Sequence, residues 1–326
     1  MLSVYQLNEE QKIAFDKVLH CVNNNISKAF FIDGPGGTGK TYLYKALLAT
    51  IRSQGCIALA TATSGVAASI LPGGRTAHSR FKIPINDDQN KYCNISKQSV
   101  LAQLIRNAKL IIWDKATMAK RKSVEALDKM LQDITNNGHF FGGKVIVFGG
   151  DFRQTLPVIT HGTREDIIDT SLVMSPLWSK VEKIRLTVNM RARLDLDFST
   201  FLMRIGDGIE QTTDEDEVQI PESINIPFQD DETSINALID TVFPNMEYIT
   251  STSSSIINRA ILMTRNDFVH QINHKLIMKF PGAERTYFSN DEPLDSSIQL
   301  QDQDPLHSLT PKGLPLHELI LKRTVQ

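Results

Sequence analysis

The chain carries at residues 34–41 the stretch Gly34-Pro35-Gly36-Gly37-Thr38-Gly39-Lys40-Thr41, which fits the pattern G-x-x-x-x-G-K-[ST] without a mismatch. An apolar run at residues 29–32 precedes this stretch and is typical of a buried parallel strand. Apolar residues at helical spacing follow it, beginning at Leu43. The loop therefore lies between a strand and a helix, which is the context that this phosphate-binding motif requires.

The residue types in the loop predict a nucleotide site. Its glycines allow backbone N–H groups to turn inward around an anion, and the N-terminus of the following helix adds partial positive charge. Lys40 is expected to reach the β- and γ-phosphates, and Thr41 to place its hydroxyl on Mg²⁺. The alternative is a glycine-rich turn that contains a lysine by chance, and the strand and helix on either side disfavour it.

Composition limits the other possibilities. A length of 326 residues suggests two domains or one domain with large insertions, and a net charge of −2 means that any nucleic-acid site must be a local patch. Cys21, Cys56 and Cys93 form no C-x-x-C pair, which argues against a disulfide framework or a zinc site and fits a reducing compartment. The N-terminus lacks the pattern of a secretory signal, and no apolar run approaches a membrane span, so no membrane association is expected.

Apolar runs and helical stripes alternate through the first half of the chain. Strands are expected at residues 56–60, 109–114 and 144–151, with helical periodicity between them. This alternation predicts an α/β fold with a parallel sheet. The pattern changes near residue 188, after which a helix with apolar residues at 198, 201, 202 and 205 is expected, and later a strand at residues 260–264.

Three further places attract attention. Asp114 ends an apolar strand downstream of the phosphate-binding loop, where a Mg²⁺ partner is expected. Gln11 lies three residues after Asn8 at a helix start, so it can serve in a capping box or recognise adenine through its amide; the local sequence favours the cap. Residues 75–81 offer arginines, hydroxyls, a histidine and an aromatic ring, which suits single-stranded nucleic acid with a stacked base or, equally, a solvated loop.

Several stretches together resemble the Pif-type DNA helicases of helicase superfamily one. The most specific are Gly149-Gly150-Asp151-Phe152-Arg153-Gln154 and the run Phe-Leu-x-x-Ile-Gly-Asp-Gly at residues 201–208, and the resemblance continues nearly end to end in the same order. It implies a P-loop NTPase with two RecA-like lobes: residues 1–187 as lobe one and residues 188–326 as a partial lobe two. It also implies ATP between the lobes, DNA across both, and movement from 5′ to 3′ on single strands.

The resemblance assigns roles by position. Gln11 would contact adenine, Lys40 and Thr41 would keep the phosphate and metal roles given above, and Asp114 would hold Mg²⁺. Gln154 would sense the γ-phosphate and Arg191 would be the arginine finger that stabilises charge on the transferred phosphoryl group. The nucleotide-binding residues would be Gln11, Gly34, Pro35, Gly36, Gly37, Thr38, Gly39, Lys40 and Thr41, and those near DNA would be Thr63, His78 and Phe81.

The implied partners are ATP, single-stranded DNA and forked DNA. DNA repair, recombination and telomere maintenance in the nucleus are the processes implied, although no targeting signal is seen and no oligomeric state is indicated.

Two departures from the family pattern bear on activity. The family has Asp-Glu-Ala where this chain has Asp114-Lys115-Ala116, and the missing glutamate would orient and deprotonate the attacking water. A charged lysine cannot do this, and losing a positioned general base typically costs about 10²–10⁴ in rate. The family also continues further into the second lobe, so this chain is expected to be C-terminally truncated relative to it.

Three functions are therefore compared: an ATP-dependent DNA helicase, a protein that binds ATP and DNA without turnover, and an unrelated P-loop enzyme such as a small-molecule kinase. The last leaves the stretches at residues 149–154 and 189–191 unexplained.

Overall fold

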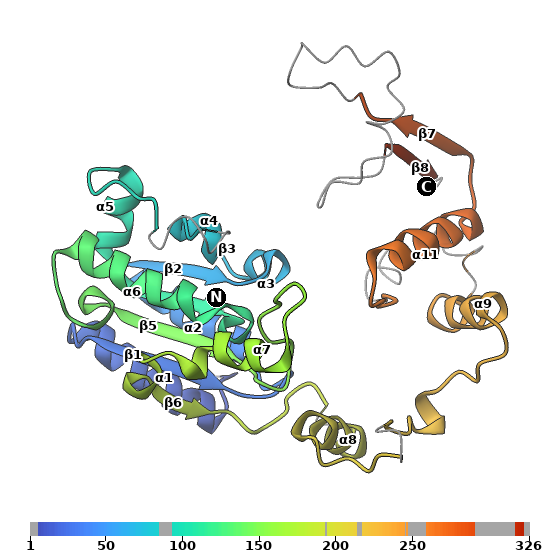
Figure 1. Ribbon diagram of the computed structural model, residues 1–326, viewed down its shortest axis with the longest axis horizontal. Coiled ribbons are helices and arrows are strands. Elements are labelled where there is room, and N and C mark those ends of the chain that lie inside the picture. The colour runs from blue at the N-terminus through green and yellow to red at the C-terminus, as the bar shows by residue number, and fades with distance from the viewer. Residues whose placement is uncertain are drawn as a thin grey trace. The chain divides into compact units, whose positions relative to one another are not determined.

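The computed structural model describes residues 6–84, 93–192, 194–213, 217–244, 246, 259–290 and 317–322 (Figure 1). The chain divides into two compact units, Met1–Val218 and Gln219–Gln326. These units are defined by internal contacts and not by likeness to RecA-like lobes, so the lobe boundary expected between residues 187 and 188 stays a prediction.

Six parallel strands form the sheet of the first unit in the spatial order β3-β2-β4-β5-β1-β6. The strands are β1 (Lys28–Asp33), β2 (Ile57–Ala62), β3 (Arg75–Thr76), β4 (Ala108–Asp114), β5 (Val145–Gly150) and β6 (Glu182–Arg185). The predicted α/β fold with a parallel sheet is confirmed. Because all six strands run the same way, the loops that follow β1, β2, β4 and β5 leave from one edge of the sheet, where ligands bind in such folds.

Helices cover both faces of this sheet (Figure 1). The helices of the first unit are α1 (Glu9–Asn23), α2 (Lys40–Ser53), α3 (Gly65–Ile70), α4 (Ala77–Phe81), α5 (Val100–Asn107), α6 (Arg121–Thr135), α7 (Arg164–Thr170) and α8 (Leu196–Asp207), of which α7 and α8 have no buried residue. The side chains of α1 and α2 pack with Phe30 and Val147, whereas those of α5 and α6 belong to the core that contains Phe31 and Phe148. Successive strand residues face opposite sides, so residues 29–32 of β1 and 145–148 of β5 are all apolar because both faces of these strands are buried.

The second unit has a smaller described core. It contains α9 (Asp231–Val242), α11 (Asn266–Lys279) and the antiparallel strands β7 (Glu284–Phe288) and β8 (Glu318–Lys322). Ile239, Phe243 and Met246 are its buried apolar cluster, against which Ile261 packs partly buried. The strand expected at residues 260–264 is wrong, because these residues pair with no strand in the described part of the chain. Among the described residues, no helix is both long and apolar enough to cross a membrane.

Candidate nucleotide site

The phosphate-binding loop depends on two glycines with positive φ. Gly37 has φ +98° and Gly39, the N-cap of α2, has φ +79°, in the left-handed region that favours glycine. Neither position has room for a side chain. A Cβ on Gly37 would lie 2.3 Å from Asn189 Oδ1, and one on Gly39 would lie 2.3 Å from Gln11 Nε2. The backbone of the loop therefore lies in direct contact with side chains from distant parts of the sequence.

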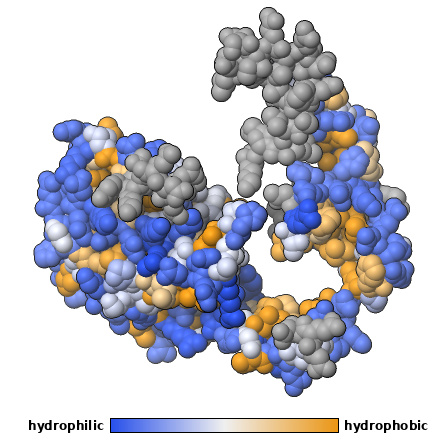
Figure 2. Space-filling view, in the orientation of Figure 1, coloured by the Kyte–Doolittle hydropathy of each residue, from blue (hydrophilic) through white to orange (hydrophobic). Residues whose placement is uncertain are grey.

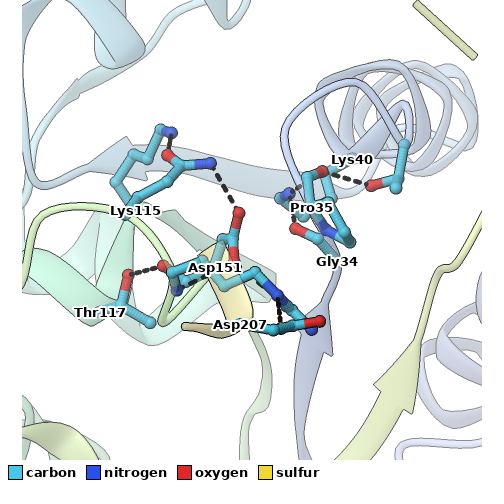
Figure 3. Close-up of polar contacts among 10 residues, drawn as sticks. Gly34, Pro35, Lys40, Lys115, Thr117, Asp151 and Asp207 are labelled. Atoms are coloured by element: carbon cyan, nitrogen blue, oxygen red, sulfur yellow. Dashed lines mark hydrogen bonds and ion pairs between the residues drawn. The ribbon is translucent and has the colours of Figure 1, made fainter. Parts of the chain in front are cut away.

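Lys40 begins α2 and lies folded over the loop. Its ammonium donates hydrogen bonds to the carbonyl oxygens of Gly34 and Pro35, the second at 3.1 Å, and the residue is 8% exposed (Figure 3). Burial lowers the pKa of Lys40, while the charges of Asp151 and Asp114 act in the opposite direction. The ammonium thus lies at the phosphate-binding loop, from which such a lysine reaches the β- and γ-phosphates.

Gln11 links the first helix to the loop. Its backbone N–H donates to Asn8 Oδ1 at 2.9 Å, and Asn8 N donates to Gln11 Oε1 at 3.1 Å, so the capping box favoured by the local sequence is confirmed. Its Nε2 also donates to the carbonyl oxygen of Thr38 at 2.9 Å. The amide therefore braces the loop, while adenine recognition by Gln11 stays a prediction.

Asp114 and Lys115 form a tight turn at the end of β4. Lys115 has φ +55°, unusual for a side-chain-bearing residue, and its backbone N–H donates to Asp114 Oδ1 at 2.9 Å. The hydroxyl of Thr63 donates to the Lys115 carbonyl oxygen at 2.6 Å and accepts a hydrogen bond from Trp113 Nε1 at 3.0 Å. Burial raises the pKa of Asp114, which the Lys115 N–H and the charges of Lys115 and Lys40 oppose.

A chain of hydrogen bonds runs from Lys115 through Gln154 to Asp151 (Figure 3). The ammonium of Lys115 donates to Gln154 Oε1, and Gln154 Nε2 donates to Asp151 Oδ2 at 2.8 Å. Gln154 also lies against the phosphate-binding loop, since a Cβ on Gly36 would be 3.5 Å from its Nε2. The predicted γ-phosphate sensor and the residue after Asp114 are thus in contact beside the loop.

Asp151 belongs to the Gly149–Gln154 stretch and has no role predicted from the sequence, yet it is the buried acceptor of this network, 3% exposed. Its Oδ1 accepts from Arg153 N at 3.1 Å and from Arg153 Nη1 at 3.4 Å. Arg153 Nε in turn donates to Asp207 Oδ1 at 2.5 Å, at the C-terminus of α8 (Figure 3). The position of Asp151 directly after an apolar strand, like that of Asp114, was the signal that could have identified it.

The segment 189–191 lies against the same loop. Met190 N donates to the carbonyl oxygen of Gly37 at 2.9 Å, and Asn189 Oδ1 accepts from Arg191 N at 3.0 Å. A Cβ on Gly37 would lie 3.0 Å from the Cβ of Arg191. The structure therefore brings the predicted arginine finger to the phosphate-binding loop from a position about 150 residues later in the sequence.

The residues predicted to lie near DNA occupy different environments. Thr63 supports the Asp114–Lys115 turn, and His78 on α4 is partly buried, with its pKa lowered by burial and by the charge of Lys120. Phe81 is 0% exposed and packs near Trp113, with ring centroids 6.3 Å apart. A ring without exposed surface cannot stack on a base, so the stacking expected from residues 75–81 is wrong at Phe81, and so is the solvated loop.

Magnesium is the metal that this site would hold. Mg²⁺ prefers carboxylate and hydroxyl oxygens. Asp114 ends β4, and Thr41 lies in the first turn of α2 directly after the loop that follows β1. Both therefore belong to the edge of the sheet from which the phosphate-binding loop leaves, and this donor set fits the metal. The metal roles of Thr41 and Asp114 stay predictions.

Comparison with known proteins identifies a family for this chain. Residues 6–216 match the profile of a family described as PIF1-like helicase. An ATP-dependent DNA helicase Pif1 of Psychrobacter is 31% identical over 153 residues, which are 46% of this chain and 23% of that protein. Human ATP-dependent DNA helicase PIF1 is 25% identical over 201 residues, 58% of this chain and 30% of the human protein. The matches thus span less than a third of these relatives' lengths.

Solved structures show the same fold. The crystal structure of Pif1 helicase from Candida albicans matches with a TM-score of 0.65 and 20% identity, covering 97% of this chain and 63% of that one. Bacteroides Pif1 bound to single-stranded DNA matches with a TM-score of 0.61 and 21% identity, also over 97% and 63%. These structures have the RecA-like P-loop fold. Since the family profile covers more than half of its length, this chain belongs to the PIF1-like helicase family.

Proposed function

We propose that the chain is an ATP-dependent DNA helicase that couples ATP hydrolysis to 5′-to-3′ movement on single-stranded DNA and to unwinding of forked DNA. The observation that supports this function best is the convergence of four elements on one loop. Gln11, Gln154 and the segment 189–191 all lie against the phosphate-binding loop that carries Lys40, and Asp114 is joined to Gln154 through Lys115. Such an arrangement suits transfer of a terminal phosphoryl group.

Each residue has a defined role in this proposal. Lys40 binds the β- and γ-phosphates, Thr41 and Asp114 hold Mg²⁺, and Mg²⁺ neutralises charge on the phosphates when it is bound. Gln154 reports the presence of the γ-phosphate, and Arg191 stabilises the charge that develops during transfer. Gln11 contacts adenine with the amide that otherwise completes the helix cap.

The wider setting is proposed from family membership. Residues 1–187 and 188–326 correspond to lobe one and part of lobe two, and the surface near Thr63 and His78 lies along the DNA path. DNA repair, recombination and telomere maintenance in the nucleus are the processes that such an activity would serve.

A second candidate function is nucleotide-dependent DNA binding without turnover. The observation that favours it is the Lys115 ammonium, which donates to Gln154 Oε1 from the position where the family pattern has a glutamate that activates the attacking water. A protonated amine cannot accept a proton, and the absence of a positioned base typically costs about 10²–10⁴ in rate.

ATP hydrolysis with and without single-stranded DNA, measured on this chain and on Lys115→Glu, separates the two functions. Turnover stimulated by DNA in the parent chain supports the helicase. No detectable ATP hydrolysis in the parent chain, together with a hydrolysis rate about 10²-fold or more higher in Lys115→Glu, supports binding without turnover. If neither protein hydrolyses ATP although both bind nucleotide, the helicase proposal for this chain is contradicted. ATP hydrolysis at a rate that DNA does not change would favour an unrelated P-loop enzyme.

A further inference from the structure

Lys115 projects from a backbone that is held on several sides. Its N–H donates to Asp114 Oδ1 at 2.9 Å, and its carbonyl oxygen accepts from Thr63 Oγ1 at 2.6 Å and from Met118 N at 3.1 Å. With φ +55°, the residue adopts a conformation that surrounding contacts must maintain. The side chain therefore starts from a fixed point at the carboxyl end of β4, as residues that act at binding sites do.

The ammonium of Lys115 lies one carboxamide away from the phosphate-binding loop. It donates to Gln154 Oε1, and the Nε2 atom of the same carboxamide is 3.5 Å from the place of a Cβ on Gly36. The close-up shows Lys115 on one side of Asp151 and Lys40 with Gly34 and Pro35 on the other (Figure 3). Burial is the largest cause that lowers the pKa of Lys40, and the charge of Lys115 acts in the same direction, so the two ammonium groups lie near enough to interact.

The Lys115 ammonium pairs with a neutral group, the Gln154 carboxamide. Among the residues that the structure describes, no carboxylate pairs with Lys115 Nζ, and Asp151 is shared by Gln154 and Arg153. The side chain is partly buried, where a cation without a counter-ion is more costly than at a fully exposed position. An anion that enters between Lys115 and the loop would supply this counter-ion and form a charge-assisted hydrogen bond.

We infer that Lys115 is a phosphate-binding residue of this site, which contacts the outer phosphate of a nucleoside triphosphate opposite Lys40. The inference rests on the proposed binding of ATP and extends it. Lys115 follows Asp114 in sequence, and the acidic residue of such sites lies at the β/γ end of the nucleotide, so the added cation meets the γ-phosphate. Positive charge supplied by the protein at that end makes ATP binding less dependent on Mg²⁺ than a site with a single lysine.

Calorimetric titration of ATP and of ADP tests this, each in MgCl₂ and in EDTA, on the parent chain, Lys115→Gln, Lys115→Arg and Lys122→Gln. The last variant removes one exposed positive charge from α6 and is the matched control. In EDTA, Lys115→Gln should weaken ATP binding about tenfold or more, since hydrogen bonds to charged groups contribute about 1.5–3 kcal/mol. Lys115→Arg and Lys122→Gln should stay near the parent, and ADP should be affected less than ATP.

The outcomes separate the inference from the function on which it rests. If Lys115→Gln binds ATP in EDTA as tightly as Lys122→Gln does, Lys115 is not a phosphate ligand, whereas ATP binding by the loop stands. If the parent chain binds neither nucleotide even with MgCl₂, the proposed function fails as well. Thermal unfolding of each variant accompanies the titrations, and Lys115→Met, a second neutral variant, replaces Lys115→Gln in the comparison should that protein not fold.

Discussion

At the scale of single residues, glycine can be required for two separate reasons: a left-handed backbone conformation and a lack of room for a side chain. Gly39 has φ +79° and lies against the Gln11 amide, whereas Gly55 has φ +74° with no heavy atom within 4 Å of an added Cβ. Alanine at either position pays the cost of left-handed backbone, about 1–2 kcal/mol. Only at Gly39 does the new methyl group also displace Gln11 Nε2 from the Thr38 carbonyl oxygen.

Gly39→Ala should therefore lower the free energy of unfolding by roughly 1 kcal/mol more than Gly55→Ala, which is the usual net contribution of one hydrogen bond. Urea unfolding of the nucleotide-free variants measures this difference. With Gln11→Ala already present, the extra loss should disappear, because the displaced amide is gone. An extra loss that persists in the Gln11→Ala background would mean that another contact of the loop is responsible.

Residue-scale chemistry was only partly predictable from the sequence. The capping box at Asn8 and Gln11 follows from local spacing and is confirmed. The contact between Lys115 and Gln154 joins residues 39 positions apart, and nothing in either local pattern indicates it. Phe81 shows the opposite error: the polar residues around it predicted a nucleic-acid surface or a solvated loop, but tertiary packing places its ring in the core.

At the scale of elements, apolar periodicity predicted β4, β5 and α8 to within a few residues, because burial on the sheet and helical amphipathicity leave strong signals. Residues 260–264 carry the same signal as a strand, but strand formation also needs a neighbouring strand with free backbone groups, which a local pattern does not reveal.

The helix α8 differs from the other long helices of the first unit in having no buried residue. Apolar side chains gather on the surface around it (Figure 2), with Leu196 70% and Leu202 47% exposed. Two polar side-chain contacts join it to earlier residues: the Arg153–Asp207 ion pair at 2.5 Å and a hydrogen bond from Asn189 Nδ2 to Ser199 Oγ at 3.3 Å. Its attachment should therefore depend on charge more than on apolar burial.

Asp207→Asn should loosen α8, and amide hydrogen exchange of residues 196–207 measures the effect. A partly exposed ion pair contributes about 0.2–1 kcal/mol, so exchange should become up to about fivefold faster. High salt should produce a similar change in the parent chain and little more in the variant, because screening removes the same interaction. Asp169→Asn, which removes the exposed partner of Arg121, is the control and should leave α8 unchanged; equal acceleration in both variants would refute the specific link.

At the scale of the whole molecule, the two compact units differ in how much apolar surface they bury. The first has a core on each face of its sheet, whereas the described residues of the second contain one small cluster around Ile239. Free energy of unfolding follows buried apolar area, so the second unit should be the less stable. We expect two unfolding transitions in urea, with α9, α11 and the β7–β8 pair losing amide protection before β1, β4 and β5.

Two substitutions show which unit unfolds in each transition. Ile146 and Ile239 are each 0% exposed, one in the sheet of the first unit and one in the cluster of the second. Replacing a buried isoleucine with alanine costs about 2–5 kcal/mol. Ile146→Ala should therefore lower the urea midpoint of the later transition alone, and Ile239→Ala that of the earlier one, as followed by hydrogen exchange at each urea concentration. A single transition that both substitutions lower would mean that the two units unfold as one cooperative structure, because a cavity in either would then destabilise both.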